Sequence, residues 1–277
     1  MREAIEQAVA DGQMGDRLWL YATYHCNLAC VYCLTESHPR IANRRRLPDE
    51  TMVRAAREAR ELGFGAVGIT GGEVSMLPGF AETLAEIAEI LPTVALTNGT
   101  LFTDKVLRRL EPLAGLDAAL QVSLDSDVPD RNDQLRGPAN FAKVVEAVPR
   151  LVERGIRVRI QTTVDDQTEE ELQRLCALHR SWGIPDDDHI VRPVVRRGRA
   201  AIKDMGIDPG PSEILPELTL TADGAFLHPF APTVRHGVTD LDLLVGRQIL
   251  PLEVPAAKLL AIVADQPIGD DVRRNIR

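Results

Sequence analysis

The chain has 277 residues, 44% hydrophobic and 26% charged, which is the composition of a soluble globular protein large enough to bury a core. Acidic residues outnumber basic ones 41 to 32, for a net charge of −9, so we expect no nucleic-acid partner, because binding a phosphate backbone requires clustered positive charge. No stretch approaches the roughly 18 apolar residues of a membrane span, and the N-terminus has no apolar signal-peptide core, so we expect a cytoplasmic protein that does not enter a membrane.

Strand-like and helix-like segments alternate along most of the chain. An N-terminal helix is expected within residues 1–16. The strand pattern, rich in β-branched and aromatic residues, recurs at 17–24, 66–70, 93–96, 116–124, 156–164 and 189–195. Helical spacing of apolar residues recurs at 48–62, 78–91, 103–113, 141–154 and 168–182. The last of these has a clear signal for a helix N-terminus, because Thr168 is followed three residues later by Glu171, as in a capping box.

This alternation predicts an α/β fold with parallel strands covered by helices. Six strand units are too few for a closed eight-unit barrel. Periodicity alone leaves two architectures open, a partial (β/α)6 TIM-type barrel and an open doubly wound sheet. In both, ligands bind at the carboxyl ends of the strands.

The pattern changes after about residue 203. Pro209, Pro211 and Pro216 crowd a segment without a clear period. Residues 218–229 predict a hairpin, and 239–265 look mostly helical, with breaks at the prolines in that range. We therefore divide the chain into an N-terminal helix (1–16), a core domain (17–203) and a small α+β C-terminal extension (204–277).

Three of the four cysteines lie within eight residues. Cys26, Cys30 and Cys33 follow the first strand, and Cys176 stands alone on a predicted helix. In a reducing compartment such crowding indicates a metal or a cluster rather than disulfides. A structural zinc ion would need a fourth ligand, which His25, His38 or Cys176 could supply. A cubane held by three cysteines would instead keep one iron open for chemistry.

The CxxxCxxC spacing, with Tyr32 before the last cysteine, resembles the radical S-adenosylmethionine (SAM) superfamily, in which SAM chelates the fourth iron of a [4Fe–4S] cluster. Further motifs of that family follow the later strands in order. They are Gly71-Gly72-Glu73, Thr97-Asn98-Gly99-Thr100, Ser123-Leu124-Asp125, Arg136, Arg192 and Gly198-Arg199-Ala200.

The resemblance implies a role for each of these positions. Cys26, Cys30 and Cys33 would hold the cluster. The Gly-Gly-Glu segment would hold the amino group of SAM, Ser123 its ribose or methionine part, and Arg136 its carboxylate. The other implied cofactor contacts are Tyr32, Asn98, Asp125 and Arg192.

Within the superfamily the pattern is most similar to the branch that contains MoaA and the SPASM/twitch peptide maturases. Those enzymes usually carry further cysteines for auxiliary clusters in their C-terminal part. Here the hairpin continues Ala225-Phe226-Leu227-His228-Pro229, without the expected ligand. We therefore interpret the extension as a twitch-like remnant without a cluster.

The implied function is reductive cleavage of SAM to a 5′-deoxyadenosyl radical that abstracts hydrogen from a small-molecule or peptide substrate. An epimerase, a lyase or decarboxylase, a mutase and a dehydrogenase all stay open as subclasses in biosynthesis. Because no leader-binding module precedes residue 17, a small molecule is slightly favoured. The electron would come from a donor such as flavodoxin or ferredoxin. The alternatives are a non-catalytic zinc or iron–sulfur protein and a radical SAM fold that has lost turnover.

Other polar residues have two interpretations each. Cys176 could return a hydrogen atom to a substrate radical or simply be a buried helix residue. Gln121, Gln161 and Arg192 alternate onto the barrel side of their strands, where a polar side chain needs a partner or a ligand. The basic run 44–46 is either a solvated loop or a contact for an anion.

Overall fold

The computed structural model describes residues 1–41, 45–209 and 214–265, so Arg44, Pro211 and the last part of the predicted extension lie outside the described residues. Eleven strands are found in the described part, and the first six match the predicted series closely. They are β1 (Arg17–Thr23), β2 (Ala66–Gly71), β3 (Thr93–Thr97), β4 (Ala118–Ser123), β5 (Arg157–Val164), β6 (His189–Pro193), β7 (Thr219–Thr221), β8 (Gly224–Phe226), β9 (Val234–Arg235), β10 (Val238–Thr239) and β11 (Leu244–Gly246).

Helices connect the first six strands as predicted. The α-helices are α1 (Arg2–Ala10), α2 (Asp49–Glu61), α3 (Phe80–Ala88), α4 (Asp104–Leu110), α5 (Pro129–Arg136), α6 (Asn140–Val152), α7 (Glu169–Ser181), α8 (Arg199–Ile202) and α9 (Glu253–Asp265). Short 3-10 turns occur at η1 (Val74–Met76), η2 (Glu111–Gly115) and η3 (Asp186–Asp188). The predicted capping box of α7 is confirmed, since Thr168 and Glu171 each accept a hydrogen bond from the backbone of the other.

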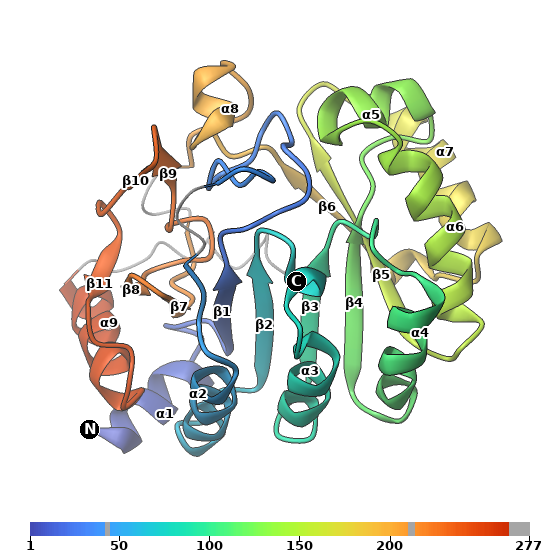
Figure 1. Cartoon of the computed structure of the whole chain (residues 1–277). Coiled ribbons are helices and arrows are strands. Elements are labelled where there is room, and N and C mark those ends of the chain that lie inside the picture. The colour runs from blue at the N-terminus through green and yellow to red at the C-terminus, as the bar shows by residue number, and fades with distance from the viewer. Residues whose placement is uncertain (42–44, 210–213, 266–277) are drawn as a thin grey trace.

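One nine-stranded sheet organises the molecule, in the order β11-β8-β7-β1-β2-β3-β4-β5-β6 (Figure 1). Strands β1 to β6 are parallel neighbours, and β7 joins the free edge of β1, also in parallel. The predicted hairpin is confirmed, because β7 and β8 pair antiparallel around the turn that contains Asp223. It extends the sheet of the core beyond β1.

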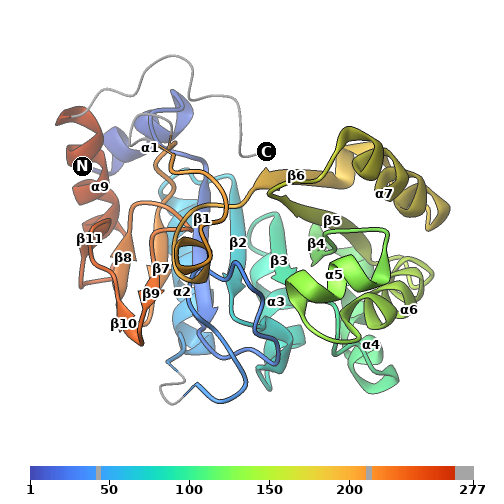
Figure 2. The same cartoon turned by 90° about the horizontal axis from the view of Figure 1, so that it is seen from above.

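The sheet curves into an arc with helices on its outer side, as the view from above shows (Figure 2). Alternate residues of each strand therefore have different surroundings. Leu18 and Leu20 of β1 belong to the large core cluster, together with Ala56 of α2 and Leu84 of α3. The other side of the strands faces the inside of the arc, here called the lumen. This confirms the partial TIM-type barrel.

The structure differs from the prediction in two segments. Residues 239–252 are not helical, because Leu244–Gly246 forms β11 against β8, and only 253–265 forms the helix α9. Helix α5 was not predicted. Its sequence, PDRNDQLR, has no apolar periodicity, although Pro129 at its start is a common signal for a helix beginning.

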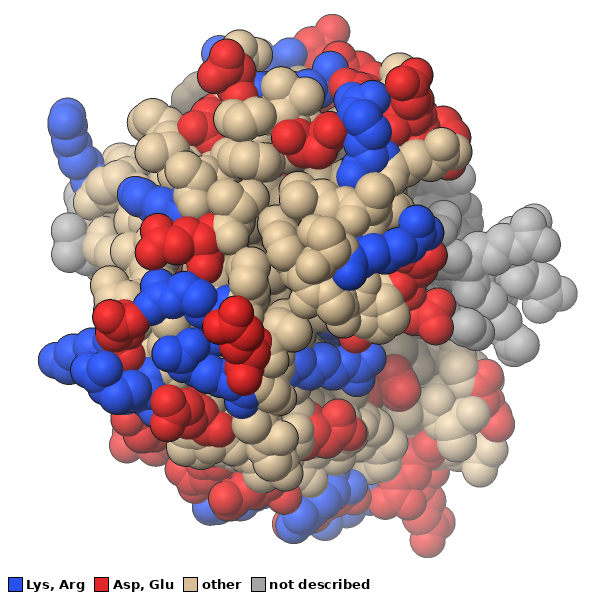
Figure 3. All heavy atoms as spheres, turned by 90° about the vertical axis from the view of Figure 1, so that its right-hand side faces the viewer, with Lys and Arg blue, Asp and Glu red and all other residues tan. Residues whose placement is uncertain are grey.

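Charges are balanced locally on the side of the molecule that carries α5 to α7, where acidic and basic side chains are interspersed (Figure 3). Ion pairs there join Arg131 with Asp166, Arg174 with Asp127 and Arg180 with Asp186.

No helix among the described residues is long and apolar enough to cross a membrane.

The basic run was predicted to be either solvated or available to an anion. Arg45 instead bonds to Asp223 and stacks on Tyr24, with its guanidinium carbon 4.5 Å from the ring centre. Arg46 is exposed. The described part of the run therefore connects the loop after β1 to the hairpin.

Candidate functional site

The three clustered cysteines lie on the long loop between β1 and α2, at the carboxyl end of the sheet. All are free thiols. Cys26 is buried, while Cys30 and Cys33 are partly exposed. The amide of Leu28 donates to Sγ of Cys26 at 3.3 Å, and the amide of Cys33 donates to the carbonyl of Cys30 at 3.2 Å. The loop thus turns back on itself and keeps its thiols near one another.

The Gly-Gly-Glu segment at the end of β2 supports the start of this loop. Gly72 donates to the carbonyl of Thr23 at 2.6 Å, and the amide of Glu73 donates to the carbonyl of His25 at 2.8 Å. A Cβ on Gly72 would lie 2.2 Å from the carbonyl oxygen of His25, and one on Gly71 would lie 2.4 Å from that of Thr23. The glycines are needed here because the cysteine loop itself passes so close.

The side chain of Glu73 is completely buried and serves the neighbouring strand. One carboxylate oxygen accepts from the hydroxyl of Thr97 at 2.7 Å and from the amide of Ser75 at 3.0 Å. The other accepts from the amide of Asn98 at 2.7 Å. Most of its acceptor positions are therefore occupied within the protein, which makes it a positioning group for the ends of β2 and β3.

Asn98 connects the end of β3 to the first cysteine. Its Nδ2 lies 3.7 Å from Sγ of Cys26 and donates to Oδ1 of Asn27 at 2.8 Å. Its Oδ1 accepts from the amide of Thr100 at 3.0 Å. The amide orientation is thereby fixed with the donor towards sulfur, an arrangement that suits a thiolate.

A buried network joins the second half of the loop to β4 and α5. The hydroxyl of Tyr32 donates to Asp125, and Nη1 of Arg136 contacts both the tyrosine oxygen and, at 3.2 Å, the Asp125 carboxylate. The Arg136 and Asp125 side chains are 7% and 0% exposed. Sγ of Cys30 lies 3.5 Å from the backbone carbonyl of Arg136. Nε of Arg136 is buried and has no partner among the described residues, so this guanidinium retains a donor for an anion.

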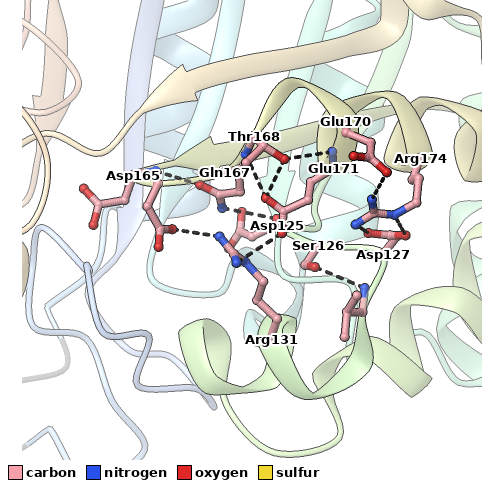
Figure 4. Close-up of polar contacts among 12 residues, drawn as sticks. Asp125, Ser126, Asp127, Arg131, Asp165, Gln167, Thr168, Glu170, Glu171 and Arg174 are labelled. Carbon is pink, nitrogen blue, oxygen red and sulfur yellow. Dashed lines mark hydrogen bonds and ion pairs between the residues drawn. The ribbon is translucent and has the colours of Figure 1, made fainter.

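Asp125 is in turn held by the loops around it (Figure 4). Its other carboxylate oxygen accepts from the amide of Thr163 at 2.9 Å, and its carbonyl accepts from Nε2 of Gln167 at 3.3 Å. Farther out, Arg131 bridges Asp166 and Glu171. These contacts fix the loops that follow β4 and β5 relative to each other.

The Gly-Arg-Ala motif beyond β6 closes the loop from the opposite side. The amide of Arg199 donates to the carbonyl of Cys33 at 3.0 Å, and its guanidinium donates to the carbonyls of Cys30 and Ser37. Gly198 has φ +57°, and a Cβ there would lie 2.2 Å from the carbonyl oxygen of Leu34. The motif therefore packs directly on the backbone of the cysteine loop.

Burial dominates the titration of the first two cysteines. It raises the pKa of Cys26 to about 12, with smaller contributions from Glu73, Cys30 and Cys33. It also raises the pKa of Cys30, and Arg136 opposes that increase. The mutual effects place the three thiols within electrostatic range of one another. A cation at this position would favour their thiolate forms.

The donor set fits a cluster better than a single ion. Within residues 1–41, 45–209 and 214–265, no three His, Cys, Asp or Glu side chains converge closely enough to bind one metal ion. A tetrahedral zinc site needs such convergence on one point. A cubane does not, because each cysteine binds a different iron. His25 and Cys176, two of the possible zinc ligands, point elsewhere: Nε2 of His25 contacts the carbonyl of Pro39 at 3.3 Å.

The remaining predicted residues line the lumen. Gln121 and Gln161 are hydrogen-bonded to each other. Ser123 pairs in register with Gln161, one step nearer the cysteine loop. Arg192 pairs in register with Thr163, and burial lowers its pKa, a shift that Glu217 opposes and Arg17 adds to. Arg192 thus belongs to a set of charged lumen residues apart from the Tyr32–Asp125–Arg136 network.

Cys176 lies on α7, outside the arc. Its Sγ is 3.1 Å from Nδ1 of His189, whose Nε2 contacts the hydroxyl of Thr162 at 2.8 Å. The His179 ring packs on that of His189 at 4.6 Å. The structure therefore places Cys176 away from the clustered cysteines.

Three residues of the site were not identified from the sequence. Asn27 could have been noticed, since it directly follows Cys26. Asn132 accepts from the amide of Asp125 at 3.0 Å but lies on the unpredicted α5. No local sequence pattern indicates a role for Glu217, because its hydrogen-bond partner Trp19 is 198 positions away.

Known proteins share both the sequence pattern and the fold. Residues 20–178 match the radical SAM superfamily. GTP 3′,8-cyclase of Clostridium perfringens is 29% identical over 172 residues, which cover 60% of this chain and 52% of the relative. Mycofactocin maturase MftC of Mycobacterium tuberculosis is 30% identical over 167 residues, covering 58% of this chain and 41% of the relative. The chain thus spans about half the length of these relatives.

Solved structures agree in fold. SuiB of Streptococcus suis, bound to S-adenosylmethionine, superposes with a TM-score of 0.58 at 21% identity, over 68% of this chain and 43% of that one. The protein anSMEcpe with bound AdoMet gives a TM-score of 0.52 at 18% identity, over 65% and 52% of the two chains.

The resemblance on which a [4Fe–4S] cluster and SAM were expected is thereby confirmed at the level of the family. The family match covers more than half of the chain and includes the cysteine loop together with the ends of β2, β3 and β4. This chain belongs to the radical SAM superfamily.

Proposed function

We propose that this protein is an active radical SAM enzyme in which Cys26, Cys30 and Cys33 hold three corners of a [4Fe–4S] cluster and SAM completes the fourth. When bound, the reduced cluster and SAM together supply a 5′-deoxyadenosyl radical that removes a hydrogen atom from the substrate. The protein's own residues hold, orient and enclose these groups.

One observation carries the proposal. Each part of the cysteine loop is held by a different element: Asn98 after β3 at Sγ of Cys26, the carbonyl of Arg136 at the end of α5 at Sγ of Cys30, and the amide of Arg199 at the start of α8 at the carbonyl of Cys33. A loop with only a structural role would not need support from three separate positions of the barrel. Such support is what a cluster must have to stand in a fixed position above the lumen.

Roles for the residues around SAM follow from their geometry. Arg136 has a buried donor left over and would take the SAM carboxylate, while Asp125 and Tyr32 keep its guanidinium in place. Ser123, at the end of β4, would contact the ribose or methionine part. Gly71 and Gly72 would offer backbone to the amino group. Glu73 and Asn98 would act through the loop they position.

The substrate class is proposed more broadly. The named relatives are a GTP cyclase and a peptide maturase, so both small molecules and peptides are represented among them. Residues 204–277 contain no cysteine for an auxiliary cluster. Without that electron acceptor, a redox-neutral rearrangement, epimerisation or decarboxylation is favoured over net oxidation. We propose a flavodoxin or ferredoxin as electron donor and the reducing cytoplasm as location.

Anaerobic reconstitution tests the proposal. The protein should turn brown and hold about four irons per chain, and a triple Cys→Ala variant at 26, 30 and 33 should hold none. Dithionite and SAM should then release 5′-deoxyadenosine. A colourless protein with one tightly bound zinc ion would replace the proposal with a structural zinc site. A full cluster without SAM cleavage would indicate a fold that has lost turnover.

A further inference from the structure

Three arginines from different strands lie near one another inside the arc of the sheet. Arg17 and Arg159 stand on the lumen side of β1 and β5, because the alternate residues Leu18 and Ile160 belong to the outer core, and both act on the charge of Arg192 on β6. Nε of each of the three arginines is buried and has no hydrogen-bond partner among the described residues. In a chain of net charge −9, three such guanidinium groups in one interior space require an explanation.

The three side chains are close enough to repel one another. Burial lowers the pKa of Arg192, and Arg17 and Arg159 lower it further. Arg17 also lowers the pKa of Arg159, after burial as the main cause. Like charges brought together away from water destabilise each other unless an anion joins them.

The carboxylates that face this group are already engaged. Asp188 accepts two hydrogen bonds from Arg157, at 2.7 and 3.1 Å, and lies 3.5 Å from Arg159. Asp117 contributes to the raised pKa of Arg157, after the larger effect of the hydrogen bond with Asp188. Glu217 accepts from Nε1 of Trp19 at 2.9 Å, and burial raises its pKa to about 7, so it is only partly ionised at neutral pH.

His228, which follows the hairpin, adds no charge to this group of arginines. His228 lies 3.8 Å from Glu217, and burial lowers the pKa of this histidine to about 3, so the ring is neutral. Of the described residues around Arg192, Glu217 alone opposes its positive charge.

The position of the group suits a substrate. Arg159 pairs in register with Gln121, two residues below Ser123, which corresponds to about 7 Å along the strand. The hydrogen-bonded amides of Gln121 and Gln161 lie between these levels. On the amino-terminal side, Arg17 and Arg159 also line a pocket of about 120 Å³. A small molecule entering the lumen from the cysteine loop would pass the level of Arg192, which pairs with Thr163, and meet Arg159 with its far end.

We infer that the lumen binds an oxyanionic group of the substrate, a carboxylate or a phosphate, through Arg192 and Arg159, with Arg17 adding to the positive potential. This rests on the proposed function only in calling the ligand a substrate. A planar guanidinium binds either oxyanion with two parallel hydrogen bonds, and the buried Nε atoms of Arg192 and Arg17, which have no hydrogen-bond partner among the described residues, leave donors for that geometry.

Anion binding to the reconstituted enzyme tests the inference without turnover. The probes are inorganic phosphate and succinate, which separate the two sources of oxyanion, with chloride at equal ionic strength as reference. At least one probe should raise the unfolding temperature in a saturable manner. Arg192→Gln should weaken that binding tenfold or more, and Arg192→Lys less. Arg57→Gln, which removes an exposed arginine paired with Glu86 on the outer helices, should bind like the parent protein.

The stability of the ligand-free protein provides a second measurement. If Arg192 awaits a ligand, ligand-free Arg192→Gln should unfold at the same temperature as the parent or higher, because one of three repelling charges is gone. A clearly lower unfolding temperature would identify Arg192 as a structural partner of Glu217 and overturn the inference. Failure of both probes to bind would overturn it as well.

Release of 5′-deoxyadenosine in the same preparations keeps the two proposals apart. SAM cleavage without any anion binding would contradict the lumen site alone. Arg192-dependent anion binding without SAM cleavage by a full cluster would support the lumen site and contradict the proposed function.

Discussion

The guanidinium of Arg199 donates a hydrogen bond to the backbone carbonyl of Cys30, 169 positions earlier in the chain. Through this contact the segment beyond the last barrel strand closes over the loop that begins after the first. Barrel closure and cysteine placement are therefore coupled through the backbone of the cysteine loop.

Replacing Arg199 tests this coupling. Arg199→Ala removes hydrogen bonds to the carbonyls of Cys30 and Ser37, so the loop should hold iron less well. We expect a lower iron content per chain and faster bleaching in air, with the far-ultraviolet circular dichroism unchanged. Arg196→Ala is the matched control, since Arg196 bonds to Asp204 and the carbonyl of Gly206 instead. Equal iron content in both variants would show that the hydrogen bonds from Arg199 to the cysteine loop are dispensable for iron binding.

Gly72 offers a steric test. In Gly72→Ala the new Cβ would lie 2.2 Å from the carbonyl oxygen of His25, and backbone there must move. Because His25 adjoins Cys26, we expect loss of most of the bound iron. Gly115→Ala has no atom within 4 Å of the new Cβ and should load iron normally. The measurement is iron and sulfide content after identical reconstitution; normal loading of Gly72→Ala would contradict the close packing.

The Asp125–Arg136 pair should dominate the stability of the site. Asp125→Asn leaves the buried Arg136 charge without its carboxylate, which costs about 3–5 kcal/mol in the free energy of unfolding. Asp127→Asn, two residues on, breaks an exposed pair with Arg174 and should cost about 1 kcal/mol or less. Anaerobic urea titrations of both variants would compare the two losses. Similar small losses would mean that water reaches Arg136.

Glu217 should make stability depend on pH. Its pKa rises from 4.5 to about 7 in the folded protein, chiefly through burial, against the opposing Trp19 hydrogen bond. The folded state therefore holds a proton that the unfolded state releases between these pH values. The stabilisation present below about pH 4.5 is lost as the pH rises to 7, on the order of 3 kcal/mol in all.

Glu217→Gln should remove this dependence. Glutamine retains an acceptor for Trp19 and does not titrate, so the free energy of unfolding of the parent relative to the variant should fall across that pH range. Denaturant titrations at several pH values measure the difference. A constant difference would show that Glu217 has an ordinary pKa.

Cys176 should be dispensable for the radical chemistry. It contacts His189 on the outer side of β6, so we expect Cys176→Ala to release 5′-deoxyadenosine within about twofold of the parent. Cys33→Ala should release none. Loss of SAM cleavage in Cys176→Ala with normal iron content would restore a catalytic role for this thiol.

Most of the barrel could be predicted because its strands and helices carry local periodicity. The six strands β1 to β6 and the capping box at Thr168 are of this kind. Helix α5 could not be found in this way, since it buries few apolar residues and is held by Asn132 and Arg136 contacts with other elements. The prediction of a helix at 239–252 is wrong because β11 forms by pairing with β8. No local sequence pattern indicates that pairing.

The order of residues along the chain was sufficient for the alternating α/β architecture, the cysteine spacing and the family, since each depends on neighbours in sequence or on short motifs. Which partners those motifs meet was decided by folding. Closure of the sheet brings Arg199 onto the loop of Cys30, turns the carboxylate of Glu73 to Thr97 and Asn98, and gathers Arg17, Arg159 and Arg192 from three strands into one lumen. Such contacts depend on distances in space between residues far apart in the chain, and these distances are set by the packing of the whole sheet.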